Sequence, residues 1–296
     1  MRRALSLLAL AIPLATACAT TREEKFDAAP ATAAAPEATE AATGLVAEGD
    51  ALWAERTDRE KLKAALAKWE EAFKAAPGGE LAVKLSRGHY FLADGHYALD
   101  PDEENRDAHY NLGTEWGERA IGLMAPGFVT AKKAGEKVPD ALKKAPAEAA
   151  PAFYWWATNL GKWAAGKGLM TLLKYKDDVK ATIDHVAATD EGFFYGAAHR
   201  YLGAYHAKAP GGSLEASETH FKKAVEMAPD YLGTKVLWAD YLCTKQRDRA
   251  TYKRLLEEVL AADANSNPDI AAENAVEQKK AQKLLADIDD LFGPES

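Results

Sequence analysis

The chain has 296 residues, of which 48% are hydrophobic and 28% are charged, and its formal net charge at pH 7 is −8. This acidic balance argues against binding to nucleic acid and against electrostatic docking on anionic lipid. Alanine is abundant, whereas clusters of Val, Ile and Thr with period-two alternation are missing. The composition therefore predicts an all-α fold.

The N-terminus has the pattern of an export signal. Arg2 and Arg3 precede an apolar run from 4 to 15, and small residues then lead to Cys18. This run is too short to span a membrane as a permanent helix. Because the cysteine directly follows small residues, residues 1–17 resemble a bacterial lipoprotein signal peptide, which predicts cleavage before Cys18 and lipidation of that residue. A plain cleaved signal peptide with an incidental cysteine is the alternative.

The residues after the predicted anchor indicate both a location and a linker. In lipoproteins of this kind an Asp after the lipidated cysteine favours retention in the inner membrane. Ala19 stands there in this chain, which predicts the periplasmic face of the outer membrane. Residues 18–43 are mainly Ala, Thr, Pro and Glu with little to bury, so we expect a lipidated disordered tether before a helical domain over 44–296.

Repeated spacings within the predicted domain indicate stacked helical hairpins. Two segments carry the closing-helix spacing of tetratricopeptide units: Ala65, Trp69, Ala72 and Pro77, and Ser217, Phe221, Ala224 and Pro229. Three segments carry the opening-helix spacing: His89, Leu92, Ala93 and His96; His109, Leu112, Gly113 and Trp116; His199, Leu202, Gly203 and His206. One hairpin cannot bury its own apolar face and must stack on neighbours. The sequence therefore predicts a tetratricopeptide-like helical-hairpin array, an α-solenoid.

The regular pattern breaks between 125 and 151, where prolines separate short pieces and a helix at 139–145 is expected. The aromatic stretch 153–163 is apolar all round, which predicts a helix inside the array. The last segment, 270–292, has the polar outer face that a terminal cap needs. The other expected helices are 44–55, 59–76, 80–98, 102–124, 176–188, 230–244 and 247–262.

Two stretches, 153–163 and 196–231, together with the lipoprotein start, resemble the T component associated with TRAP transporters (TatT), a family of periplasmic helical lipoproteins. The resemblance covers about the whole mature chain. It implies a non-catalytic, tetratricopeptide-like protein that assembles as a homotrimer and pairs with an extracytoplasmic solute-binding protein of the transporter. It also implies an interior pore or groove that helps to pass a hydrophobic small molecule. It carries over no ligand contacts of single residues.

The sequence argues against a metal site and against a nucleotide-binding site. His89 and His96, like His199 and His206, are seven residues apart on one helix, a rise of about 10.5 Å that is too long for one zinc ion. We expect these histidines to bond to neighbours in a core or groove, and no metal or other cofactor is predicted. Residues 161–168 nearly match a phosphate-binding loop but lack its Ser or Thr and follow a helix instead of a strand.

The aromatic side chains allow two interpretations. Plain core packing is one; the other is a ligand cavity, whose wall would consist of Trp156, Asn159, Trp163, His199 and Tyr205. No serine elbow, metal motif or pair of nucleophile and base indicates an enzyme. We therefore expect a transporter accessory that binds a protein partner and a hydrophobic ligand, with an envelope protein–protein scaffold unrelated to transport as the alternative.

Overall fold

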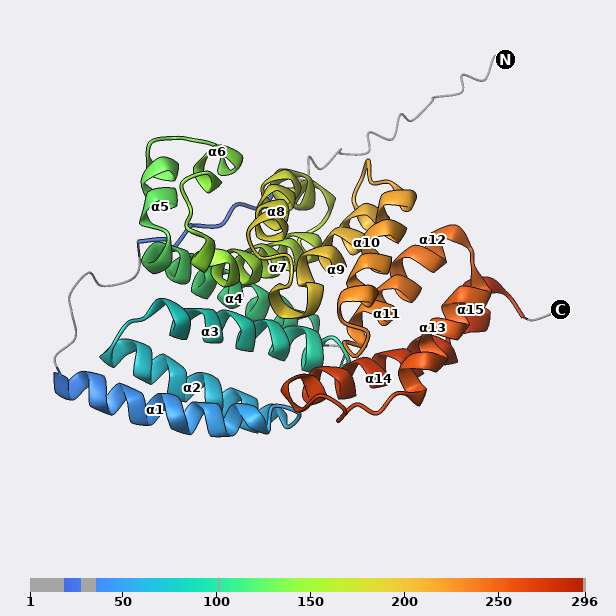
Figure 1. Ribbon diagram of the computed structural model, residues 1–296, viewed down its shortest axis with the longest axis horizontal. Coiled ribbons are helices and arrows are strands. Elements are labelled where there is room, and N and C mark those ends of the chain that lie inside the picture. Colours follow the sequence, from blue (N-terminus) through green and yellow to red (C-terminus); the bar gives the residue numbers. More distant parts are fainter. Residues whose placement is uncertain (1–18, 28–35, 101, 295–296) are drawn as a thin grey trace, which may run out of the picture.

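The computed structural model of the protein describes residues 19–27, 36–100 and 102–294 (Figure 1). Over these residues the chain forms helices and no β-strand, which confirms the predicted all-α array. The first half contains these elements: α1 (Pro36–Ala54), α2 (Arg59–Ala75), α3 (Gly79–Phe91), the π-helix η1 (Leu92–Tyr97), α4 (Glu103–Met124), α5 (Pro126–Lys133), α6 (Val138–Leu142), the 3-10 helix η2 (Ala147–Ala149), α7 (Ala150–Gly166) and α8 (Leu169–Thr189).

The second half begins with α9 and ends at Phe292. Its elements are α9 (Phe193–Lys208), α10 (Leu214–Met227), α11 (Gly233–Leu237), the π-helix η3 (Trp238–Cys243), α12 (Thr244–Gln246), α13 (Arg249–Ala261), the 3-10 helix η4 (Pro268–Ile270), α14 (Ala271–Ala286) and α15 (Ile288–Phe292). The expected helix 230–244 is thus divided into α11, η3 and α12. The expected terminal helix 270–292 breaks near Asp287 into α14 and α15.

Neighbouring helices pack as hairpins because each has one apolar face. Asp58 caps α2 by accepting hydrogen bonds from the amides of Glu60 and Lys61, and Trp69 on the buried face of α2 stacks 5.5 Å from Trp53 of α1. The aromatic helix α7 is buried along most of its length, as its all-round apolar pattern predicts. It lies between α4 and α8, and forms the centre of the first half.

The excursion predicted between 125 and 151 contains α5, α6 and η2, which cover one end of the stack (Figure 1). Phe128 of α5 is fully buried and meets Phe153 of α7 at 5.0 Å between ring centroids. The proline-punctuated segment is therefore folded against the core, and the expected helix at 139–145 is observed as α6.

In the second half, α9 and α10 pack through a small residue that lies against a large one. Gly203 of α9 lies directly against the ring of Phe221 of α10, where a Cβ atom would be 2.8 Å from the ring. Ser217 donates a hydrogen bond of 2.7 Å to the carbonyl of Gly203, which ties the two helices together. This hairpin is the counterpart of α3 and α4, where Ser86 donates to the carbonyl of Gly113 over 2.7 Å.

Helix α14 closes the array by returning to the first half, which the sequence does not predict (Figure 1). Val276 of α14 belongs to the large core of the first half and would contact a Cβ atom at Gly95 of η1. Glu273 of α14 pairs with Arg56, between α1 and α2, and with Arg87 of α3. The segment predicted to cap the array thus also forms a seam to the first half of the chain.

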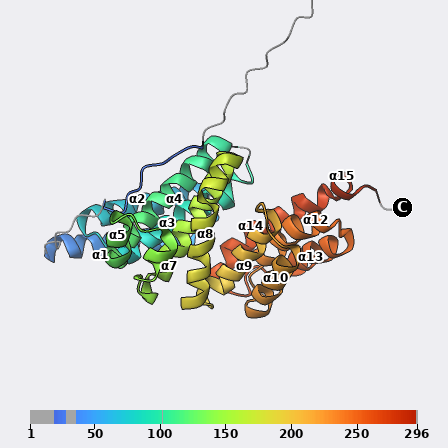
Figure 2. The same cartoon turned by 90° about the horizontal axis from the view of Figure 1, so that it is seen from above.

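The segment expected to be a disordered tether also differs from expectation. Residues 19–27, here called the N-terminal strap, run from α8 across α7 and α4 toward α5 (Figures 1 and 2), and α1 begins at Pro36 instead of 44. Two side chains hold this segment against the helices. Phe26 is buried against the core, and Arg22 pairs with a buried acid. The predicted signal peptide and Cys18 lie outside the described residues.

Candidate functional site

A cavity of about 700 Å³ lies inside the array, between the first half and the second half, and α14 forms part of its wall. We call it the central cavity. Its wall comes from α3, η1, α7, α8, α9, α11, η3 and α14, so it forms only because the chain closes on itself. A volume of this size is that of a typical small-molecule site.

One side of the central cavity is a continuous aromatic wall. Tyr90 of α3 lies 5.4 Å from Trp155 of α7, which lies 5.1 Å from Phe194 of α9, measured between ring centroids. Phe194 in turn lies 5.6 Å from Tyr231, and Tyr201 adds a further ring to the lining. Burial raises the pKa of Tyr201 and of Tyr231, so their hydroxyls stay neutral hydrogen-bonding groups.

The other side carries a cluster of three charges. Asp94 of η1 accepts hydrogen bonds from Lys162 of α7 over 2.8 Å and from Lys280 of α14 over 2.6 Å. Tyr110 also donates to Asp94 over 3.0 Å. Burial would raise the pKa of Asp94, but the two lysines outweigh burial and hold that pKa well below its usual range. Lys280 also donates to Glu277 of the cavity wall over 2.8 Å, so a second carboxylate joins the cluster and the two lysines face two acids.

Two arginines add polar groups at the aromatic wall. The guanidinium of Arg200 lies 3.9 Å from the ring centroid of Tyr231 and donates to the carbonyls of Tyr195 and Phe194 over 3.0 and 3.3 Å. Phe194 and Tyr195 have φ of 41° and 61°, a left-handed conformation that costs energy for aromatic residues. Arg200 therefore stabilises a strained turn that directs Phe194 into the cavity. Arg87 lies 4.6 Å from the Phe194 ring centroid.

The wall also contains buried polar atoms without a hydrogen-bond partner in the described part of the chain, among them the Nε of Arg87. The hydroxyl of Thr158 on α7 is buried and has no hydrogen-bond partner among the residues that the structure describes. Buried hydroxyls are nearly always bonded, and an unbonded one beside a cavity is suited to a ligand. Together, the aromatic wall, the charged cluster and this hydroxyl form a site for a mainly apolar molecule with a polar end.

The structure separates the five residues that the sequence predicts for a cavity wall. Among them, Tyr205 lines the central cavity, and the other four lie outside its described lining. Trp156 packs 6.0 Å from Phe26, and Trp163 packs 5.9 Å from Tyr175, between ring centroids. Their role in binding stays a prediction, which the positions of Trp156 and Trp163 in the core do not favour.

The two polar members of that set make other contacts. Asn159 is fully buried and donates to the carbonyls of Ser86 and Trp155 over 3.2 and 2.8 Å, so it joins α7 to α3. His199 bonds to His220 over 2.9 Å and to Glu191 over 3.0 Å, on a different face of α9 from the cavity. Sequence reasoning missed Asp94, Lys162 and Lys280, because their spacing in the chain carries no local motif.

Two pairs of histidines bond across neighbouring helices, which agrees with the expectation of histidines in a core or groove. His89 of α3 bonds to His109 of α4 over 3.0 Å, in the same arrangement as His199 and His220. Within the described part of the chain, no group of three or more His, Cys, Asp or Glu residues could hold a metal ion. Cys243 is buried, and burial raises the pKa of its thiol to about 12.

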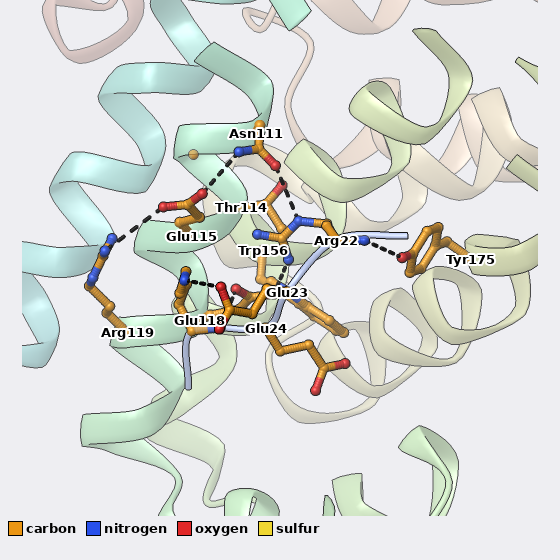
Figure 3. Close-up of polar contacts among 12 residues, drawn as sticks. Arg22, Glu23, Glu24, Asn111, Thr114, Glu115, Glu118, Arg119, Trp156 and Tyr175 are labelled. Carbon is orange, nitrogen blue, oxygen red and sulfur yellow. Dashed lines mark hydrogen bonds and ion pairs between the residues drawn. The ribbon is translucent and has the colours of Figure 1, made fainter. Parts of the chain in front are cut away.

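Polar contacts hold the N-terminal strap against α4 (Figure 3). Its Arg22 donates to the buried carboxylate of Glu118 and, over 3.2 Å, to Asn111. The amide of Lys25 also donates to Glu118, over 2.8 Å. Burial raises the pKa of Glu118 despite these partners. Phe26 packs 5.7 Å from Phe128, between ring centroids, so both ionic and apolar contacts hold the strap.

Comparison with known proteins gives one match. Residues 94–292 match the model of a protein family described as the TRAP transporter T-component. Nothing among curated proteins matches the chain. Among the described residues, no helix is both long enough and apolar enough to cross a lipid bilayer. The match begins at Asp94 and includes α7, α9 and α14, which form most of the central cavity.

Proposed function

The chain belongs to the TRAP transporter T-component family, and from this premise we propose that it is a non-catalytic accessory protein of such a transporter. In this proposal it binds the extracytoplasmic solute-binding protein of the transporter and holds a hydrophobic ligand in the central cavity. The observation that supports the ligand is the cavity itself, which is lined by aromatic rings and edged by Lys162 and Lys280. The helical-hairpin array supports the protein partner, because stacked hairpins offer extended binding surfaces.

The proposed location is the periplasmic face of the outer membrane, with a lipid anchor on Cys18. The basic and apolar start of the chain, the small residues before Cys18 and Ala19 after it support this location. Assembly as a homotrimer is part of the same proposal and is tested by the mass of the protein in solution. Co-purification with a solute-binding protein encoded beside this chain would support the partner.

The ligand is tested by native mass spectrometry of the protein purified from its own cell envelope. We expect an adduct with the mass of an amphipathic small molecule, released when the protein unfolds. Replacing the free hydroxyl in the variant Thr158→Val should weaken binding of that molecule about tenfold, which corresponds to one lost hydrogen bond. Since Thr158 has no partner within the described chain, this variant should fold with normal stability.

The matched control is Thr182→Val on α8, whose hydroxyl donates to the carbonyl of Asp178 over 2.8 Å. This control should keep the adduct. A protein that carries no adduct and cross-links only to envelope proteins would contradict the ligand and favour the scaffold alternative. Turnover of a substrate that is lost in a stable His199→Ala variant would contradict the non-catalytic part of the proposal.

A further inference from the structure

The N-terminal strap fixes where the chain leaves the helical body on its way to Cys18. The amide of Thr20 donates to the hydroxyl of Thr171 over 2.9 Å, and Lys174 donates to the hydroxyl of Thr21 over 2.6 Å. Thr171 and Lys174 both belong to the first turns of α8. The exit point of the chain therefore lies beside the start of α8 (Figures 1 and 2).

The start of α8 also carries a group of exposed apolar side chains. Leu169, Met170 and Leu173 are 61%, 50% and 37% exposed. Residues three and four positions apart lie on one side of a helix, so these three side chains form one surface, the α8 patch. Exposing three large apolar side chains side by side to water is energetically unfavourable. Such a surface indicates an interaction site.

Chain length connects the exit point to the predicted anchor. Cys18 is two residues from Thr20, a distance of at most about 7 Å along an extended chain. Acyl chains on Cys18 would therefore enter a bilayer next to the start of α8. We propose that the α8 patch lies in the interfacial region of the membrane to which Cys18 is anchored. This inference rests on the proposed anchoring.

Two lysines flank the α8 patch and give it a polar edge. Lys167 pairs with Asp107 over 3.2 Å and Lys174 donates to Thr21 over 2.6 Å, while the stems of long basic side chains can lie on apolar surface at a membrane interface. A bound strap also excludes free rotation: because Thr20 and Arg22 are bonded to the body, the anchor cannot swing to another face. A bilayer is thus the surface that the patch meets first.

The end of α7 and the start of α8, next to the patch, also border the central cavity. Ala165, which is exposed, and Leu172, on the inner side of α8, both belong to the cavity wall. If the α8 patch rests on the membrane, this edge of the cavity faces the lipid. A hydrophobic ligand would then pass between cavity and bilayer along an apolar route beside α8.

The test uses the mature, acylated protein in vesicles of phosphatidylethanolamine and phosphatidylglycerol that contain a lipid with a shallow nitroxide quencher. An environment-sensitive fluorophore is attached to Met170→Cys, and in a control to Leu260→Cys on α13, where the leucine is 42% exposed. The native Cys243 is buried and should not react. We expect a blue shift and loss of most of the fluorescence at position 170, and unchanged fluorescence at position 260.

A second variant tests whether the apolar side chains of the α8 patch, and not the fluorophore, cause the membrane contact. Adding Leu169→Glu and Leu173→Glu to Met170→Cys should restore the fluorescence, since both leucines are exposed and the fold does not depend on them. Acylated protein with no quenching at 170, or with shielding only after a solute-binding protein is added, overturns the membrane contact. A mature chain whose mass shows no acyl groups overturns the anchoring and, with it, this inference. The ligand adduct described above is independent of both.

Discussion

Arg56 and Glu273 form a buried ion pair between residues 217 positions apart, with 2.5 Å from Nη2 to Oε2. Arg56 lies in the turn after α1, and Glu273 lies in the first turn of α14. The same arginine donates to the carbonyl of Asp269 over 2.9 Å, and the other oxygen of Glu273 accepts from Arg87 over 2.7 Å. One carboxylate thus joins the two ends of the array and closes the central cavity.

Neutralising this carboxylate should loosen the seam. In the variant Glu273→Gln the buried guanidinium of Arg56 loses its counter-charge, and removing one partner of a buried pair typically costs about 3 kcal/mol or more. Urea denaturation should report that loss in the free energy of unfolding. The control Glu257→Gln, at an exposed position of α13, should stay within about 0.5 kcal/mol of the parent protein. Equal stability of the two variants would contradict the role of the seam.

Two glycines in helices should respond in opposite ways to alanine. At Gly117 of α4 a Cβ atom would lie 2.8 Å from the Cα of Trp156, so Gly117→Ala must push α4 and α7 apart and should cost about 1–3 kcal/mol. At Gly44 of α1 nothing lies within 4 Å of an added Cβ atom. Gly44→Ala should therefore gain about 0.5–1 kcal/mol from helix propensity. Thermal unfolding measures both, and a stabilising Gly117→Ala would refute the close packing.

The N-terminal strap should detach when its apolar contact is removed. Phe26→Ala deletes the ring that packs on Phe128 and Trp156, a loss of about 3 kcal/mol for a buried phenylalanine. We expect the amide of Lys25, which donates to Glu118, to lose its protection in hydrogen-exchange mass spectrometry. Glu23→Ala is the control, because the Glu23 side chain is 82% exposed. Protection that survives Phe26→Ala would show that the ionic contacts suffice.

Acid should destabilise the protein through its partly buried histidines. Burial, and after it the charges of His89 and Lys63, lowers the pKa of His109 from 6.5 to about 4. Between these two values the unfolded chain binds a proton that the folded chain does not, so stability present above pH 6.5 is lost as pH falls toward 4. With allowance for the partial exposure of His109, the loss is about 1–2 kcal/mol.

Urea denaturation at a series of pH values across this window measures the effect. His109→Gln removes the titrating group and should reduce the slope of stability against pH, while the contact to His89 is kept by the amide. A slope that is unchanged in this variant would assign the acid sensitivity to other groups. The lowered pKa values of His96 and His220 contribute in the same direction.

The periodicity of the sequence predicts the helical hairpins, but it does not predict that α14 returns to the first half of the chain. The spacings around Trp69 and Phe221 predict stacked helical hairpins, and both aromatic side chains are fully or almost fully buried. Hairpins can be predicted because the contact between two consecutive helices depends only on the spacing of residues within those helices. The seam at Glu273 depends on the curvature accumulated over the whole array, and no local spacing encodes that curvature.

The same limit explains the candidate site. Asp94 and Lys280 meet in space at a separation of 186 residues, so no motif links them. The aromatic residues of α7 were prominent in the sequence, but a helix that is apolar all round does not indicate which face meets a cavity. Trp155 lines the cavity, whereas Trp156, one position along, faces the strap. The strap itself was hidden because Phe26 and Arg22 stand in a polar, alanine-rich stretch.

The seam formed by α14 has a consequence for how such a chain can evolve. An open solenoid can gain or lose a repeat, because each unit touches only its neighbours. Here the helices that wall the cavity connect Arg56 to Glu273, and a duplicated or deleted hairpin among them would move these two residues apart. We expect length variation among relatives to be confined to segments that do not line the cavity, such as α5 and α6, which cover one end of the stack.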